Sequence, residues 1–240
     1  MRSSVPGSQT HTANRTSHAV FLVFDLDGTL IDGYDAIADA LAYAMEKFGL
    51  RPLPPARVRV LVGHGIEKLL ESAVGSARAP EGVRLFRERY PRVAIEKTRL
   101  MPGVPAVLAE LSGRGHEMAV ASNKPERFSR MILEACGVGG HFVAVAGPDR
   151  ETPTKPHPAM LLRLMAGAGT EARDTVVIGD MEVDSEFARA AGCRVVLIAS
   201  GSRTRRELLD VDADALLDTI ADLPGWLRRP AQSRKLPTES

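Results

Sequence analysis

An apolar run leads directly into two acidic residues in the segment Val20-Phe21-Leu22-Val23-Phe24-Asp25-Leu26-Asp27-Gly28-Thr29-Leu30. The apolar residues predict a buried strand, and the Gly-Thr pair marks the turn that ends it. In an open α/β fold, acidic residues behind such a strand lie at the carboxyl edge of a parallel sheet, where ligands bind. Two carboxylates in one loop repel each other unless a proton or a cation relieves them. The segment therefore indicates a site for a hard divalent cation.

The composition indicates one large domain, or a core with a small inserted domain. The chain has 240 residues, of which 44% are hydrophobic, enough for a sizeable core. Its 31 basic and 30 acidic residues leave a net charge of only +1, so no electrostatic argument favours nucleic acid or an anionic membrane as a partner. No apolar stretch is long enough for a spanning helix. Two cysteines cannot build a disulfide framework, so a cytoplasmic location is expected. The oligomeric state is left open.

Most of the chain alternates short apolar runs with helical patterns, which is typical of βαβ units. Strands are expected at Val20–Asp25, Glu117–Ala121, Phe142–Ala146, Thr175–Gly179, Arg194–Ile198 and Ala215–Leu217. Helices are expected at Pro105–Ser112, Pro125–Cys136, Pro158–Ala166, Ser185–Ala191 and Arg203–Leu209. Right-handed crossovers then predict an α/β fold whose Rossmann-like parallel sheet is covered on both faces.

Residues 33–100 interrupt this alternation because they show only helical patterns. Helices are expected there at Tyr34–Phe48, Ala56–Leu61, Gly65–Val74 and Glu81–Glu96. We expect an inserted all-helical lobe at 33–100 and a catalytic core formed by 19–32 and 101–227. The links near Ile31–Gly33 and Leu100–Gly103 would act as its hinges. The alternative, extra helices packed on the sheet, stays open at this point.

The two ends of the chain predict little ordered structure. Residues 1–18 are rich in Ser and Thr and lack acidic residues, but no apolar h-region of a signal peptide follows them, so they predict a disordered leader and not a secretory signal. Residues 228–240 contain Pro, Arg and Ser and predict a flexible tail.

Four segments in order resemble the motifs of the haloacid dehalogenase-like phosphohydrolases. The first is Asp25-x-Asp27-Gly28-Thr29-Leu30, followed by Val120-Ala121-Ser122-Asn123-Lys124, Lys155-Pro156-His157-Pro158 and Val177-Ile178-Gly179-Asp180-Met181-Glu182-Val183-Asp184. The resemblance spans roughly residues 20–220. A finer likeness to the phosphoglycolate phosphatase-type branch lies in Arg59-Val60-Leu61-Val62-Gly63-His64-Gly65 and in residues 184–192. The resemblance implies that residues 33–100 form a helical cap over the active site.

The two acids of the first segment are expected to divide the chemistry. Asp25 is predicted to be the nucleophile, because attack by a carboxylate splits ester hydrolysis through an aspartyl phosphate. Asp27 is predicted to protonate the leaving oxygen and then to activate water. The resemblance implies that Asp25 is also a metal ligand and that Asp27 adds a metal contact through its backbone carbonyl. The alternatives are a strand-end acid that caps the next turn and an Asx-turn residue.

Phosphate-binding groups are expected from three loops. The amide of Gly28 can point at a phosphate oxygen after the sharp turn. Ser122 and Asn123 follow a strand, so their polar groups reach the same edge of the sheet, although an ordinary helix cap is the alternative. Lys155 precedes a predicted helix within a stiff Pro-containing segment, where an ammonium supports an anion and neutralises the nucleophile. Lys155 is therefore predicted to act in both phosphate binding and catalysis.

The fourth segment is expected to complete a magnesium site. Asp180 follows a strand and is predicted to ligate Mg²⁺ together with Asp25 and Asp27. Asp184 is predicted to hold Lys155 or metal-bound water from behind the ligands. The hydroxyl of Thr29 is expected to fix the Asp27 carboxylate or to satisfy the backbone.

Three polar residues of the inserted lobe are candidates for substrate selection. Arg59, His64 and Lys68 lie on or beside the Gly-His-Gly segment, which suggests a loop in close approach to a ligand. For each of them a solvated surface position is the alternative.

These observations predict a magnesium-dependent phosphate monoester hydrolase that acts on a small phosphorylated metabolite through an aspartyl phosphate. Phosphoglycolate is the best single candidate. The alternatives are a phosphomutase of the β-phosphoglucomutase type, which shares both acids, and a phosphate-binding regulatory module without turnover. The presence of every expected catalytic side chain argues against the regulatory module.

Overall fold

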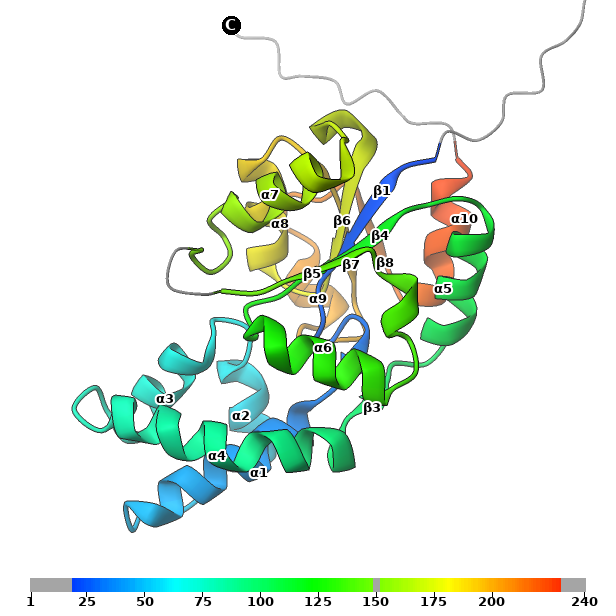
Figure 1. Ribbon diagram of the computed structural model, residues 1–240. Coiled ribbons are helices and arrows are strands. Elements are labelled where there is room, and N and C mark those ends of the chain that lie inside the picture. Colours follow the sequence, from blue (N-terminus) through cyan, green and yellow to red (C-terminus); the bar gives the residue numbers. More distant parts are fainter. Residues whose placement is uncertain (1–18, 149–151, 230–240) are drawn as a thin grey trace, which may run out of the picture.

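A computed structural model, which describes residues 19–148 and 152–229, shows a six-stranded parallel sheet flanked by helices, with a helical lobe beyond one edge (Figure 1). The strands run in the order β5-β4-β1-β6-β7-β8. They are β1 (Phe21–Phe24), β4 (Met118–Ala121), β5 (Ala144–Ala146), β6 (Thr175–Gly179), β7 (Arg194–Ile198) and β8 (Ala215–Leu217). The observed strands fall within or coincide with the predicted ones.

The strand order reverses at β1, and this reversal positions the site. The chain passes from β1 outward to β4 and β5, returns to β6 on the other side of β1, and continues outward to β7 and β8. Phe24, the last residue of β1, pairs with Val120 of β4 and with Ile178 of β6. The loops that follow these three strands therefore meet at one edge of the sheet, at the kind of switch point where open α/β folds bind ligands.

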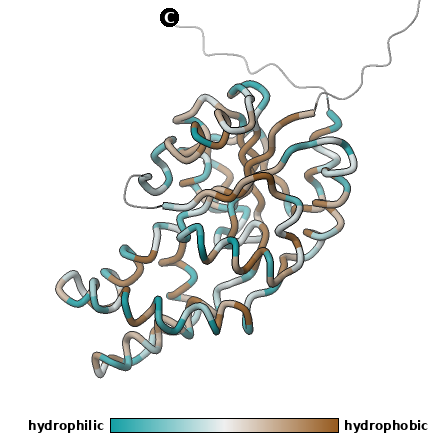
Figure 2. Tube along the Cα trace, in the orientation of Figure 1, coloured by the Kyte–Doolittle hydropathy of each residue, from teal (hydrophilic) through white to brown (hydrophobic). Residues whose placement is uncertain are grey.

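Alternating side chains of the strands build two hydrophobic cores, one on each face of the sheet. Leu22 and Phe24 face α5 (Val104–Gly113), α6 (Glu126–Ala135) and α10 (Leu223–Leu227), whereas Phe21 and Val23 face α7 (Ala159–Ala168) and α8 (Glu182–Ala190). Figure 2 shows the hydrophobic residues concentrated along the central strands. The remaining short elements are α9 (Arg205–Leu208) and the 3₁₀ turns Gly139–His141, Ala172–Asp174 and Ile220–Asp222.

The helical lobe consists of α1 (Tyr34–Lys47), α2 (Pro55–Leu61), α3 (Ile66–Val74) and α4 (Ala79–Lys97). In Figure 1 these helices gather below the sheet, beyond the end where β1 finishes. Apolar residues such as Leu41, Leu70 and Tyr90 are fully buried and continue the core of the α5–α6 face. The predicted α/β fold class with an inserted helical cap is confirmed, and we call residues 33–100 the cap.

Two short strands that the sequence did not predict join the cap to the core. β2 (Ile31–Asp32) and β3 (Arg99–Leu100) pair antiparallel, with Ile31 opposite Leu100 and Asp32 opposite Arg99. A pair of two-residue strands carries too little hydrophobic alternation to be recognised in a sequence. The two predicted hinge segments therefore lie side by side.

Other differences concern helix ends and the termini. The helix predicted at Ser185–Ala191 begins earlier, at Glu182, and α10 was not predicted. The predicted leader at residues 1–18 lies outside the described residues, as does the predicted tail except for Arg228 and Arg229. Among the helices of the described residues, none combines the length and the apolar character that crossing a bilayer requires.

Candidate active site

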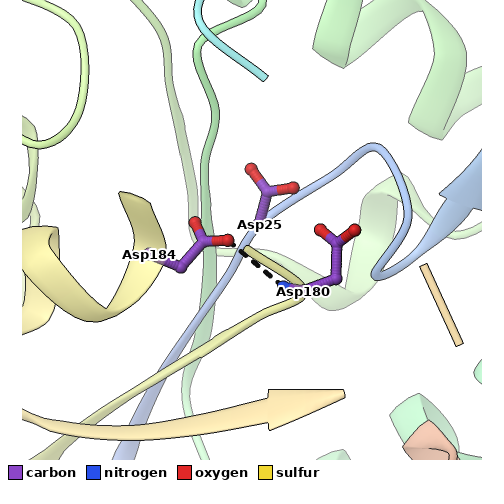
Figure 3. Close-up of side chains that lie close together, drawn as sticks. All are labelled: Asp25, Asp180 and Asp184. Carbon is purple, nitrogen blue, oxygen red and sulfur yellow. Dashed lines mark hydrogen bonds between the residues drawn. The ribbon is translucent and has the colours of Figure 1, made fainter. Parts of the chain in front are cut away.

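Three carboxylates meet where β1 and β6 end. Asp25 follows β1, Asp180 follows β6, and Asp184 lies in the first turn of α8, so that the three side chains converge (Figure 3). One oxygen from each lies within 4.8 Å of the other two. Hard cations such as Mg²⁺ take carboxylate oxygens of this kind. The donor set therefore fits a divalent cation.

The oxygens of Asp184 are already engaged by protein groups. Its Oδ1 accepts a hydrogen bond from Nζ of Lys155 at 2.8 Å. Its Oδ2 accepts from the backbone amides of Asp180 at 3.2 Å and Met181 at 3.1 Å. This arrangement fits the predicted role of Asp184, which is to hold Lys155 and the metal-binding loop, better than direct coordination.

Lys155 is buried between two carboxylates. Its Nζ lies 2.7 Å from Oδ1 of Asp25 and 2.8 Å from Oδ1 of Asp184, and its side chain is 1% exposed. Burial alone would lower the pKa of Lys155, but the charges of Asp184 and Asp25 outweigh it and raise the pKa above its ordinary value. Lys155 therefore brings a permanent positive charge to the Asp25 carboxylate.

The carboxylate cluster is electrostatically strained without a cation. Burial raises the pKa of Asp25 to about 7, against the opposing charge of Lys155. Burial also raises the pKa of Asp180 well above its usual range, and the charges of Asp25 and Asp184 raise it further. A bound divalent cation would offset this repulsion.

Asp27 lies next to this cluster but takes a different partner. Its Oδ2 is 2.8 Å from Nζ of Lys124, a residue that the motif reading did not place in the site. The same Nζ donates to the hydroxyl of Tyr90 on cap helix α4 at 2.7 Å. The buried Oδ1 of Asp27 has no hydrogen-bond partner among the described residues. This oxygen is shielded from solvent and lies close to the backbone of Gly33, where a Cβ would come within 2.8 Å of it, and Oδ2 is held by Lys124.

The Asp180 carboxylate is fixed by two loops. The hydroxyl of Thr29 lies 3.5 Å from Oδ1, and the backbone amide of Ser202 donates to Oδ2. Thr29 therefore contacts Asp180, whereas the sequence suggested either the Asp27 carboxylate or the backbone as the partner of its hydroxyl. A Cβ on Gly28, whose φ is +89°, would lie 2.3 Å from Oδ2 of Asp180. Both loops must stay close to this carboxylate, which explains the glycine.

The two residues after β4 have separate partners. Ser122 is buried, and its Oγ accepts the backbone amide of Lys124 at 3.3 Å. The carboxamide of Asn123 accepts the backbone amide of Lys155 at 2.7 Å and donates to the carbonyl of cap residue Gly63 at 2.8 Å. Because its side chain is committed to the backbone, Asn123 fits a positioning role for Lys155 better than the predicted phosphate contact. Ser122 remains a candidate phosphate ligand.

A cavity of about 70 Å³ lies between the core and the cap. Its core side carries the candidate functional groups Asp25, Asp27, Ser122, Asn123, Lys124, Lys155 and Asp184. Its cap side is apolar and is formed by Ile37, Val62, Ile66, Leu69 and Phe86, together with the backbone of Gly63 and Gly65. The cavity therefore has one charged wall and one apolar wall.

None of the three predicted cap residues lines this cavity. Arg59 stacks on the ring of Tyr34 at 4.1 Å and donates to the carbonyl of Gly201 at 3.5 Å, so it joins the cap to the core beside the cavity. His64 is exposed. Lys68 is exposed and pairs with Glu71 at 3.7 Å. The structure does not bring His64 or Lys68 to the candidate site.

The sequence motifs did not place three contributors to the site. These are Lys124, Tyr90 and the loop around Ser202, which contacts Asp180 through its backbone. Lys124 stands within a recognised motif, but its partner Tyr90 is distant in sequence and depends on where α4 packs. A backbone contact such as that of Ser202 leaves no residue-type signal at all.

The sequence matches the family described as haloacid dehalogenase-like hydrolase over residues 22–198. It is 34% identical to a phosphoglycolate phosphatase of Rhodospirillum rubrum over 220 residues, which cover 87% of this chain and 91% of that protein. It is 33% identical to a phosphoglycolate phosphatase of Aquifex aeolicus over 180 residues, covering 75% and 84% of the two chains.

Solved structures agree with this match. A predicted phosphoglycolate phosphatase from Haemophilus somnus superposes with a TM-score of 0.78 at 26% identity, covering 87% of this chain and 97% of that one. A haloacid dehalogenase-like hydrolase from Streptococcus pneumoniae superposes with a TM-score of 0.81 at 21% identity, covering 88% and 99%. At that lower identity the second likeness concerns the fold alone. The resemblance seen in the four motifs is confirmed.

Proposed function

We propose that this chain, which belongs to the haloacid dehalogenase-like hydrolase family and is a phosphatase, hydrolyses a small phosphate monoester through a phosphorylated Asp25. One observation carries the proposal. Asp25, paired with the buried cation Lys155, and Asp27, paired with Lys124, line the same cavity beside a carboxylate cluster. Nucleophile, charge neutralisation and proton donor are the groups that this reaction requires.

The reaction has two steps in which the side chains exchange roles. In the first, an oxygen of Asp25 forms a bond to phosphorus while the bond from phosphorus to the leaving oxygen breaks, and Asp27 gives that oxygen a proton. In the second, Asp27 takes a proton from water, the water oxygen attacks phosphorus, and the Asp25 carboxylate is released with inorganic phosphate. Lys155 offsets the phosphate charge through both steps, and the hydroxyl of Ser122 would donate a hydrogen bond to a phosphate oxygen.

Asp25 and Asp180, with the backbone carbonyl of Asp27, are the groups that we propose hold Mg²⁺. The carboxylate oxygens are close together, and burial, with neighbouring carboxylates adding to it, raises the pKa values of Asp25 and Asp180. When bound, the cation neutralises charge on the nucleophile and on the phosphoryl oxygens. Thr29 and the loop at Ser202 orient Asp180, and Asp184 orients Lys155.

Phosphoglycolate is the substrate that we propose first. Relatives that carry this activity in their names are 33% and 34% identical and align over most of both chains. The small cavity favours a short leaving group. The same small cavity leaves little room for a sugar phosphate to change its orientation between two half-reactions, which the phosphomutase alternative would require.

The test is phosphate release from phosphoglycolate by the purified protein with magnesium and with a chelator. The Asp25→Asn variant should lose at least about 100-fold in kcat, because an amide is not a competent nucleophile for this step. Asp35→Asn, which makes the same change on an exposed face of α1, is the matched control and should retain full turnover. Acid-quenched wild-type enzyme should carry a phosphoryl group on the peptide that contains Asp25. Full turnover by Asp25→Asn would refute the mechanism.

A further inference from the structure

Lys124 is a buried cation that faces the cavity from the core side. It lies in the loop between β4 and α6, and its side chain is 8% exposed. Its Nζ is held by Oδ2 of Asp27 at 2.8 Å and by the hydroxyl of Tyr90 at 2.7 Å. Burial alone would lower the pKa of Lys124, but the charge of Asp27 and the contacts with Tyr90 together outweigh burial and raise it, so the group stays cationic.

The ammonium of Lys124 has a donor to spare. An ammonium group carries three N–H donors, and within the described part of the chain Asp27 and Tyr90 account for two of them. Since Lys124 lines the cavity, the third donor is available to a ligand there. A buried donor of this kind is costly unless something accepts from it.

The position of Lys124 relative to Asp27 identifies the part of the ligand that it would meet. In the proposed reaction Asp27 protonates the leaving oxygen, so the leaving group lies against Asp27. A substituent two bonds beyond that oxygen is within reach of a cation that contacts the same carboxylate. Lys124 therefore faces the leaving group, whereas Lys155 faces Asp25 and the phosphoryl group.

The opposite wall of the cavity is apolar and offers no charged partner to a leaving group. The cap side chains that line it are Ile37, Val62, Ile66, Leu69 and Phe86, and none carries charge. The cationic candidates of the cap lie elsewhere, with Arg59 beside Gly201 and Lys68 on the surface. An anion on the leaving group would therefore be unpaired unless Lys124 paired with it, and a low-polarity wall strengthens such a pair.

The geometry points to Lys124 as a specificity residue that binds a carboxylate on the leaving group of the substrate. The inference rests on the proposed function, because it takes the leaving group to lie beside Asp27. Lys124 would thereby favour short phosphate monoesters that carry a carboxylate close to the ester bond, the class to which the proposed substrate phosphoglycolate belongs. Tyr90 fixes the ammonium from the cap, so this contact forms only with α4 in place against the core.

A comparison of two substrates of the same shape distinguishes binding of a substrate carboxylate by Lys124 from a role in which Lys124 only orients Asp27. They are phosphoglycolate and 2-methylpropyl phosphate, in which a neutral branched group replaces the carboxylate. Wild-type kcat/KM should favour phosphoglycolate by about 10- to 100-fold, the range expected for one charged hydrogen bond. Lys124→Met should slow both substrates by weakening Asp27 and should in addition abolish the preference. Lys68→Met, a lysine change on the exposed side of the cap, should keep the preference.

A binding measurement with stable phosphonates provides a second readout. Wild-type protein should bind 3-phosphonopropanoate about 10- to 100-fold more tightly than 3-methylbutylphosphonate, and Lys124→Met should bind the two equally. Equal binding of both by the wild type would overturn the inference whether or not the variant folds. An unchanged preference in Lys124→Met would also overturn it. Failure of the wild type to hydrolyse either ester would refute the proposed function instead, because the preference is measured separately by binding.

Discussion

Gly28 shows how closely single residues are constrained around the carboxylate cluster. It follows the two acids of the first motif, has a φ of +89°, and leaves only 2.3 Å between a built Cβ and Oδ2 of Asp180. A side chain here would be strained by the backbone and would also push Asp180 out of place. The residue thus couples the nucleophile loop to the proposed metal ligand.

Gly28→Ala should lower the free energy of unfolding more than the same change at a glycine that has a positive φ but no neighbouring atom close to its Cβ position. Gly169 is the matched control, because its φ is +64° and a built Cβ meets nothing within 4 Å. Gly169→Ala should lose about 1 kcal/mol from left-handed strain, and Gly28→Ala at least about 1 kcal/mol more from the clash. Urea unfolding of both variants measures this difference. Equal losses would mean that Asp180 moves aside freely.

His116 should make the stability of the fold depend on pH. The residue is 8% exposed, its ring lies beside the backbone of Val20, and burial lowers its pKa. A histidine with a lower pKa in the folded state binds protons more weakly there than in the unfolded chain. Protonation then favours unfolding, so stability should fall as pH drops below about 6.5.

The matched variants for this prediction are His116→Gln and His64→Gln. The pH dependence of the free energy of unfolding between about pH 7 and pH 5 should be smaller in His116→Gln than in the wild type. His64 is exposed, so His64→Gln should leave the dependence unchanged. If the free energy of unfolding of His116→Gln depended on pH as strongly as that of the wild type, another group would be responsible for the effect.

At the scale of the residue, the sequence predicted the groups that follow strands better than those that depend on packing. Asp25, Ser122 and Asp180 each directly follow a strand of one parallel sheet, so their proximity follows from the fold. The partnership of Lys124 with Tyr90 requires the position of α4 over the core, which no local pattern encodes. For Asn123 the residue type suggested a ligand contact, but its carboxamide is occupied by the backbone of Lys155 and Gly63.

The elements of the cap meet the core through a few polar contacts beside the cavity. The side chain of Arg59 on α2 reaches the carbonyl of Gly201, and the hydroxyl of Tyr34 on α1 pairs with that of Ser202. The loop from 200 to 203 also holds Asp180 through the amide of Ser202. Contact between cap and core is therefore linked to the placement of a proposed metal ligand.

Arg59→Ala should weaken catalysis without unfolding the protein. It removes the stacking on Tyr34 and the contact to Gly201, so the closed arrangement becomes less favourable by about 1 kcal/mol and KM should rise by about fivefold. Steady-state kinetics against phosphoglycolate measure this change. Lys68→Ala, which removes only a surface pair with Glu71, should leave both kinetic constants within about twofold. A larger effect at Lys68 than at Arg59 would contradict the observed placement of the two side chains.

At the scale of elements, the periodic patterns located every strand of the main sheet but not the pieces that lack a pattern. Strands β6, β7 and β8 coincide with their predicted ranges because each is a short run dominated by apolar residues. The pairs Ile31–Asp32 and Arg99–Leu100 are strands only because the cap brings them together. Helix α8 begins at Glu182 because the Asp184 carboxylate accepts the amides of Asp180 and Met181 at its start, a capping arrangement that the predicted start at Ser185 missed.

For the whole molecule, we expect the carboxylate cluster that serves the proposed function to lower the stability of the metal-free protein. Three acids with oxygens within 4.8 Å of one another repel in the metal-free protein. Asp180→Asn removes one charge from a buried site, so the metal-free variant should be more stable than the metal-free wild type. Magnesium should raise the melting temperature of the wild type, since a ligand that binds only the folded state stabilises it.

Thermal unfolding with magnesium and with a chelator tests both statements. The wild type should show a magnesium-dependent rise in Tm, and Asp180→Asn should show little or none from a higher metal-free Tm. Asp174→Asn, a change at an acid whose side chain is half exposed just before β6, should behave as the wild type does. A full magnesium response in Asp180→Asn would place the cation elsewhere.

The pairing of β2 with β3 also bears on the order in which the chain assembles. β1 must find β4 across the entire cap, which is a long loop to close, and loop closure costs more entropy as the loop lengthens. If the cap helices associate first, Asp32 and Arg99 already lie opposite each other, and the loop left to close is several times shorter. The saving is about 1 kcal/mol in the barrier to pairing the central strands. Pulse-labelled hydrogen exchange during refolding should then find amides of α1 and α4 protected no later than those of β1 and β4, and the opposite order would exclude this route.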